Sequence, residues 1–228
     1  MSEQTGLLKS SLSKKYLMAI SGLFLILFLT QHFIINLLSV FSAEAFNNTS
    51  HFMGTNPLIQ FVIQPILIFG VVFHFVMGFL LEKQNRAARP QKYAFSNPSA
   101  NSTWMSRYMI LSGAVIFWFL ALHFYDFWFP EINTKFIQGD MSGLSIDGNF
   151  RYHEELIHKF TNPIRVSIYI LAFIFLSLHL LHGFQSAFQS LGARHPKYTP
   201  CIKNLGTLYA VAIPLGFAII AIYHFFSH

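Results

Sequence analysis

Five long apolar stretches alternate with short polar connections along this chain of 228 residues. A helix needs about 20 consecutive apolar residues to cross the hydrocarbon core of a bilayer. The pattern therefore predicts membrane-spanning helices near residues 16–41, 58–82, 107–129, 163–190 and 205–226. The expected fold is an all-α polytopic membrane protein, with one integral-membrane domain over residues 1–228.

Prolines agree with this division of the chain. Asn162-Pro163 opens the fourth stretch, as expected at the start of a helix. Pro65 and Pro214 lie inside the second and fifth stretches. They are expected to kink those helices, which membrane proteins tolerate.

The most informative polar positions are four histidines, one in each of the first four spans: His32, His74, His123 and His179. Their surroundings repeat. Nine residues separate a Ser-Gly pair from His32, and nine separate a second Ser-Gly pair from His123, whereas His74 and His179 are each followed four residues later by glycine. Ionisable side chains inside a bilayer are rare and usually functional.

Each histidine lies sixteen residues after the predicted start of its span, which is about 24 Å along a helix. Successive spans run in opposite directions. His32 and His123 should therefore share one level of the membrane, toward the outside, while His74 and His179 share a second level toward the cytoplasm.

Two imidazoles at one depth on facing helices can ligate a haem iron from both sides. Zinc more often needs four ligands at one point. The pattern therefore favours two b haems, with the first four spans forming the haem-binding bundle. Gly22, Gly78, Gly113 and Gly183 would leave room for the porphyrins, although glycine on a membrane helix also serves close helix packing. A transporter whose histidines relay protons is the metal-free alternative.

His182 lies three residues after His179, on nearly the same helix face. The repeated spacing to glycine favours His179 as the ligand. The segment His153–His158 resembles a zinc protease motif but is one residue too long, so the required histidine pair is absent.

Composition and charge narrow the class further. The chain is 54% hydrophobic and 11% charged, and its one cysteine, Cys201, excludes an internal disulfide and a thiolate-ligated cluster. Eleven of the fifteen Lys and Arg residues lie in the N-terminal tail and the second-to-third and fourth-to-fifth connections. The positive-inside rule places those segments and the N-terminus in the cytoplasm, and the C-terminus outside. The charge is thus a topology signal, and no nucleic acid partner is expected.

The ordered histidines, the five spans and the segment 179–192, HLLHGFQSAFQSLG, resemble the two-haem cytochrome b membrane-anchor subunit of succinate dehydrogenase and fumarate reductase. The resemblance covers nearly the whole chain and makes His32 and His123 the ligands of the outer haem. It makes His74 and His179 the ligands of the inner haem. Some members of that family have a glutamate two residues before the fourth histidine, where this chain has Ser177, so a proton route through that carboxylate is not supported.

The resemblance implies a multi-pass protein of the bacterial cytoplasmic membrane that binds an FAD-containing flavoprotein subunit and an iron–sulfur subunit on the cytoplasmic side. The chain itself would not act on succinate or fumarate. It would carry electrons between the iron–sulfur subunit and a quinone, with menaquinone expected. A di-haem cytochrome b of another membrane dehydrogenase or of a hydrogenase is the alternative.

Quinone chemistry also moves protons, so a titratable group is expected near the outer haem. Asp126 lies three residues after His123, on the same helix face and near the outer surface. It is the candidate proton donor or acceptor, with Glu44, Glu154 and His158 as rivals. An acid at the end of a helix can also be purely interfacial.

Overall fold

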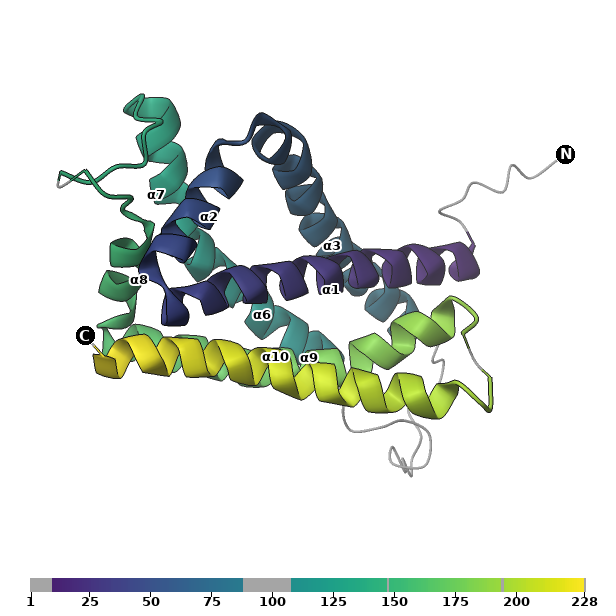
Figure 1. Ribbon diagram of the computed structural model, residues 1–228. Helices are drawn as coiled ribbons and strands as arrows, with labels where there is room; N and C mark the ends of the chain where they lie inside the picture. The colour runs from purple at the N-terminus through teal and green to yellow at the C-terminus, as the bar shows by residue number, and fades with distance from the viewer. Residues whose placement is uncertain (1–9, 88–107, 147, 194, 228) are drawn as a thin grey trace, which may run out of the picture.

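The computed structural model describes residues 10–87, 108–146, 148–193 and 195–227, and this part of the chain is almost entirely helical (Figure 1). Its elements in chain order are α1 (Ser11–Phe41), α2 (Ala43–Thr55), η1 (Ile59–Ile63), α3 (Gln64–Ala87), α6 (Met109–His123), η2 (Phe124–Trp128), α7 (Phe129–Ile132), η3 (Asn133–Ile137), α8 (Tyr152–Phe160), α9 (Pro163–Ser190) and α10 (Thr199–Ser227). Within the described residues, an isolated bridge between Leu144 and Phe150 is the only β-type pairing.

Five helical segments are long and apolar enough to cross a membrane: Leu12–Phe41, Ile59–Ala87, Met109–Ile137, Pro163–Ser190 and Thr199–Ser227. The all-α, five-span prediction is confirmed. The predicted start of the third span, residue 107, lies outside the described residues. Four more of the eleven basic residues that predicted the topology also lie outside them: Lys9, Arg89, Lys92 and Arg194. The second, third and fifth helical segments run past their predicted C-terminal ends, because apolar composition marks the bilayer core rather than the last helical turn.

Two helices in the polar connections were not predicted. α2 begins directly after α1, where the Ser42 side chain accepts a hydrogen bond from the Ala45 backbone N–H. α8 precedes α9 and carries Glu154 and Glu155 in its first turn, where acids are favoured by the helix dipole. These helices are short and polar, so a search for long apolar stretches passes over them.

Two stretches of wide, π-type helix precede prolines. η1 ends two residues before Pro65, and η2 ends two residues before Pro130. Proline lacks an N–H, and its ring clashes with the carbonyl four residues earlier. Both helices instead bond the N–H of the residue before proline to the carbonyl five residues earlier, Gln64 to Ile59 and Phe129 to Phe124. The prolines thus widen these helices without ending them.

The short helices α2, α7 and α8 gather at one end of the bundle, which we call the capped end (Figure 1). At the opposite end α1 begins, α3 finishes and α10 begins. This basic end carries Lys14, Lys15, Lys83, Arg86, Lys197 and Lys203. Most of the described acids lie at the capped end: Glu44, Asp126, Glu131, Asp140, Glu154 and Glu155. Six of the described basic side chains thus lie at one end of the folded bundle, and most of the described acids lie at the other.

Helices α9 and α10 form the most extensive helix pair, and their buried side chains build the core with Phe46, Leu156 and Phe160 of the cap. Large apolar side chains remain exposed on the outside of the bundle, among them Leu27, Trp118 and Leu208. In water such a surface would be costly, but against lipid it needs no cover.

A buried charge network holds the cap together. The Lys135 ammonium, 1% exposed, donates to the Gly54 carbonyl at 2.6 Å and pairs with Glu131 at 2.6 Å. Arg151 also pairs with Glu131, and with Glu155 at 2.6 Å. α2, α7 and α8 are thereby tied to one another by charge-assisted hydrogen bonds, which are stronger than neutral ones.

Replacing Lys135 should loosen this cap. Lys135→Met removes the cation that balances Glu131 and leaves the Gly54 carbonyl without its donor, so we expect a loss of about 3 kcal/mol in the free energy of unfolding. Arg86→Ala is the matched control, because its pair with Glu82 is exposed and should contribute less than about 1 kcal/mol. Denaturant unfolding in detergent measures both, and equal effects would contradict the account.

Candidate functional site

The four histidines of the spans meet as two pairs. His32 on α1 and His123 on α6 have ring centroids 5.7 Å apart, with their planes at 86°. His74 on α3 and His179 on α9 have ring centroids 6.4 Å apart, with their planes at 67°. Each pair combines one helix from the first half of the chain with one from the second half.

The two pairs lie at different levels of the bundle. Ser21 contacts His74, and it lies eleven residues before His32 on the same helix. Ser112 contacts His179, and it lies eleven residues before His123. Eleven residues of α-helix span about 16 Å, so the capped-end pair (His32 and His123) and the basic-end pair (His74 and His179) are separated by about that distance along the helices.

Both spacings suit a metal ion held between two imidazoles. A bond from a metal to an imidazole nitrogen is about 2 Å long, so imidazoles on opposite sides of one ion have centroids about 6 Å apart. No group of three or more His, Cys, Asp or Glu residues able to hold a metal ion occurs within the described parts of the chain. A six-coordinate haem iron can take two protein ligands because the porphyrin supplies the other four. A pair of imidazoles at each level fits that number.

The basic-end histidines have equivalent partners. Ser21 Oγ lies 3.0 Å from His74 Nδ1, and Ser112 Oγ lies 3.2 Å from His179 Nδ1. Each serine hydroxyl also donates at 2.9 Å to the carbonyl three residues earlier on its own helix. In each half of the chain, the serine of the Ser-Gly pair thus contacts the histidine of the His-x-x-x-Gly motif.

Glycines admit these close contacts. A Cβ at Gly22 would lie 3.4 Å from His74 Cε1, and one at Gly113 would lie 3.6 Å from His179 Cε1. Both glycines therefore lie against an imidazole ring, and the expectation that they leave room for a porphyrin stays a prediction. Gly78 and Gly183 face methionine methyls instead, as their Cβ positions would lie 3.6 Å from Met18 Cε and 3.5 Å from Met109 Cε, respectively.

Sequence reasoning missed these two methionines. Met18 and Met109 each precede the Ser-Gly pair by three residues, so the repeated pattern is Met-x-x-Ser-Gly. Their carbonyls accept the serine hydroxyls, and their methyls lie over the glycines that follow His74 and His179. The repeat is present in the sequence, but methionine in a membrane helix does not by itself indicate a functional site.

The capped-end histidines have mainly aromatic surroundings. Phe28 stacks on His32 with centroids 5.4 Å apart, and Phe217 lies 5.7 Å from the same ring. Phe127 lies 5.2 Å from His123, whose Nδ1 is buried without a hydrogen-bond partner. A buried ring nitrogen without a partner costs free energy, so this pair is less well satisfied by the protein than the basic-end pair.

Asp126 lies beside the capped-end pair, at the start of η2. It is 2% exposed, pairs with Arg165 Nε at 3.0 Å and accepts a hydrogen bond from the Tyr169 hydroxyl at 2.9 Å. The Tyr169 ring lies 6.3 Å from the His123 ring. The second carboxylate oxygen of Asp126 has no partner. Arg165 and Tyr169 were not singled out from the sequence, where no spacing links them to Asp126.

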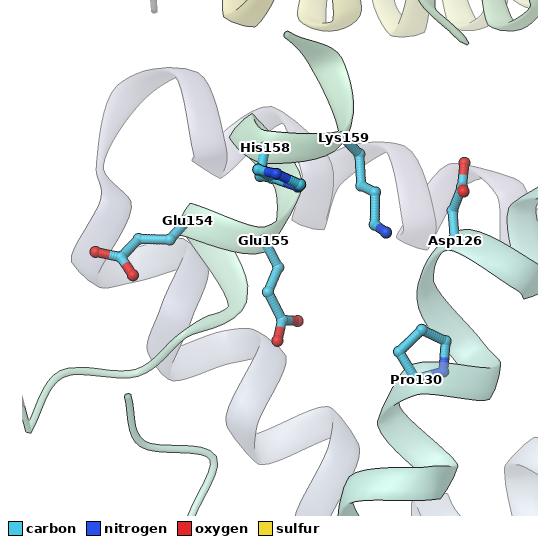
Figure 2. A pocket seen from close by; sticks show the side chains of 6 residues that line it. All are labelled: Asp126, Pro130, Glu154, Glu155, His158 and Lys159. Carbon is cyan, nitrogen blue, oxygen red and sulfur yellow. The ribbon is translucent and has the colours of Figure 1, made fainter. Parts of the chain in front are cut away.

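A pocket of about 400 Å³ opens next to Asp126. Its lining residues are Asp126, Pro130, Glu154, Glu155, His158 and Lys159. Figure 2 shows Glu155 and Lys159 projecting from α8 into the space between that helix and the segment that carries Asp126 and Pro130. Glu154 and His158, two of the three rival candidates, thus lie in the same pocket as Asp126, whereas Glu44 lies in the first turn of α2, outside that lining.

The remaining histidines take other contacts. His182 faces Ser186, whose Oγ lies 3.1 Å from its Nε2, so α9 presents His179 rather than His182 to His74. His224 is fully buried beside Ser39, with Oγ–Nε2 at 2.9 Å, and its ring lies 5.6 Å from His153. His51 stacks on Phe150 in the cap.

Comparison with known proteins adds no assignment. No family model matches the chain, and neither a curated protein nor a solved structure matches it. Any function has to be inferred from the residues themselves.

Because the buried Asp126 carboxylate pairs with Arg165, we expect substitutions at these two residues to have non-additive effects on the free energy of unfolding. Arg165→Met leaves a buried carboxylate without its cation and should lower the free energy of unfolding by about 3 kcal/mol. Asp126→Asn in the same chain removes that charge, so the double variant should recover more than half of the loss. Unfolding of the two single variants and the double variant measures the coupling, and strictly additive losses would contradict it.

Proposed function

We propose that this chain is the membrane cytochrome b subunit of a succinate dehydrogenase/fumarate reductase complex and binds two b haems through paired histidines. His32 and His123 would hold one haem, and His74 and His179 the other. The observation that carries the proposal is the pair of histidine–histidine contacts, each spaced for one iron and separated by about 16 Å along the bundle. The family is inferred from the ordered histidines and the segment 179–192 described above.

Haem supplies a one-electron carrier at each level. The protein holds the ligands, excludes water and sets the distance between the two sites. Electrons would pass between an iron–sulfur subunit at the basic end, the basic-end pair, the capped-end pair and a quinone, with menaquinone expected. The chain would anchor the catalytic subunits without acting on succinate or fumarate itself.

The charges support one orientation in a bacterial cytoplasmic membrane. Positive charge favours the cytoplasmic side, so the basic end would face the cytoplasm and the capped end would face outward. The N-terminus would then be cytoplasmic and the C-terminus outside. Lys14, Lys83, Arg86 and Lys197 would be placed to meet the iron–sulfur subunit, which connects the chain to an FAD-containing flavoprotein.

The pocket beside Asp126 supports proton exchange at the capped end. The Asp126 carboxylate contacts Tyr169, Tyr169 contacts the His123 ring, and Asp126 is buried in the wall of the pocket. Quinone oxidation or reduction at this level would release or take up protons. Asp126 would accept or donate them while Arg165 balances its charge.

A di-haem cytochrome b of another membrane dehydrogenase or of a hydrogenase would use the same histidine pairs. The two functions differ in the partner: a succinate or fumarate enzyme brings a subunit with covalently bound flavin. Purification of the intact complex from its native membrane and detection of flavin fluorescence in a denaturing gel would separate them. A hydrogenase would bring no such band.

The haem content tests the proposal directly. The purified protein, expressed with ample haem supply, should show a low-spin b-type spectrum and two haems per chain by pyridine haemochromogen assay. His179→Ala should remove one haem, whereas the matched control His182→Ala should retain both. A colourless wild-type preparation would favour the metal-free transporter instead, and loss of haem from the His182 variant alone would reverse the choice of ligand.

Replacing Asp126 tests its proposed role in proton exchange. Asp126→Asn can still accept the hydrogen bond from Tyr169 but cannot take up a proton, so quinone turnover by the complex should fall about 100-fold. Glu44→Gln is the control and should behave as the wild type. A wild-type rate across the pH range, with both haems retained, would rule out the role of Asp126.

A further inference from the structure

The hydroxyl groups of Ser21 and Ser112 each lie between a backbone carbonyl and a histidine ring. A serine carries one hydroxyl proton. Ser21 Oγ is placed to donate to the Met18 carbonyl at 2.9 Å and lies 3.0 Å from His74 Nδ1. When the hydroxyl proton is on the Met18 side, the oxygen can accept a hydrogen bond from a His74 ring that is protonated on Nδ1.

The same contacts occur in the second half of the chain. Ser112 Oγ is placed to donate to the Met109 carbonyl at 2.9 Å and lies 3.2 Å from His179 Nδ1, and the Met109 backbone also hydrogen-bonds His179. A ring that is protonated on Nδ1 keeps on Nε2 the lone pair that binds a metal. The two halves of the chain reach this arrangement with the same residue types at the same spacing.

The capped-end pair has no such arrangement among the described contacts. His123 Nδ1 is buried without a partner. The Asn36 amide nitrogen lies 3.4 Å from both ring nitrogens of His32, at the limit of hydrogen bonding, and donates to the His32 carbonyl at 2.8 Å. The two levels of the bundle therefore differ in whether a serine hydroxyl contacts the ring nitrogens.

We infer that Ser21 and Ser112 are positioning residues, which preset His74 and His179 for iron binding through Nε2 and lower the reduction potential of the haem held there. The inference rests on the proposed function. A hydrogen bond from Nδ1–H raises the basicity of the coordinating nitrogen. A more basic ligand stabilises ferric iron over ferrous iron, and hydrogen bonding to ligands is one of the ways in which a protein tunes a haem.

Single variants, Ser21→Ala and Ser112→Ala, test the inference in the full-length protein. A redox titration followed by visible spectra should show that one of the two haems shifts to a higher potential while the other keeps its wild-type value. Apparent affinity for that haem should also fall about 10-fold or more. Ser21→Thr and Ser112→Thr retain a hydroxyl on Cβ and should restore both properties.

Ser186→Ala is the matched control, because it removes a serine hydroxyl 3.1 Å from His182 Nε2 on the same membrane helix as His179. It should leave both potentials unchanged. The inference is overturned if the alanine variants keep wild-type potentials, if the control shifts a haem by the same amount, or if the threonine variants behave like the alanine variants. Absence of haem from the wild type would instead overturn the proposed function.

Discussion

An imidazole inside a membrane has to satisfy its two ring nitrogens without water, and this constraint organises the bundle. A ring nitrogen left alone in an apolar interior costs free energy, so each histidine needs a partner from the protein or from a ligand. At the basic-end level, Ser21 and Ser112 provide it for one nitrogen of each ring. At the capped-end level, His123 Nδ1 remains unpartnered among aromatic side chains. The two levels are alike in having a pair of histidines and differ in their hydrogen bonding.

The arrangement follows from a repeat that relates α1 and α3 to α6 and α9. Each half carries Met-x-x-Ser-Gly on its first helix and His-x-x-x-Gly on its second. The halves meet so that each histidine pair takes one member from each. α10 adds a packing surface for α9 and α1, and α2, α7 and α8 close one end. The repeated helices thus build the paired sites, while the parts outside the repeat make the two ends of the molecule different.

The sequence predicted the spans well because bilayer thickness dictates their length and composition. The level of Ser21 beside His74 also follows from the chain, since Ser21 precedes His32 by eleven residues of one helix. The sequence did not predict α2 or α8, because both helices are too short and too polar to be found as membrane spans. The contact of Asp126 with Tyr169 and Arg165 joins α9 to η2, and the α6–α9 packing that aligns them is a tertiary property. The ring positions over Gly22 and Gly113 likewise depend on how the helices pack.

The central claim is that each cofactor is shared between the halves of the chain, and haem stoichiometry in double variants tests it most directly. The account predicts that His32→Ala with His123→Ala leaves one haem per chain, because both ligands serve the same iron. His32→Ala with His74→Ala should leave none, because each removes a ligand from a different iron. Equal haem content in the two double variants would contradict the pairing.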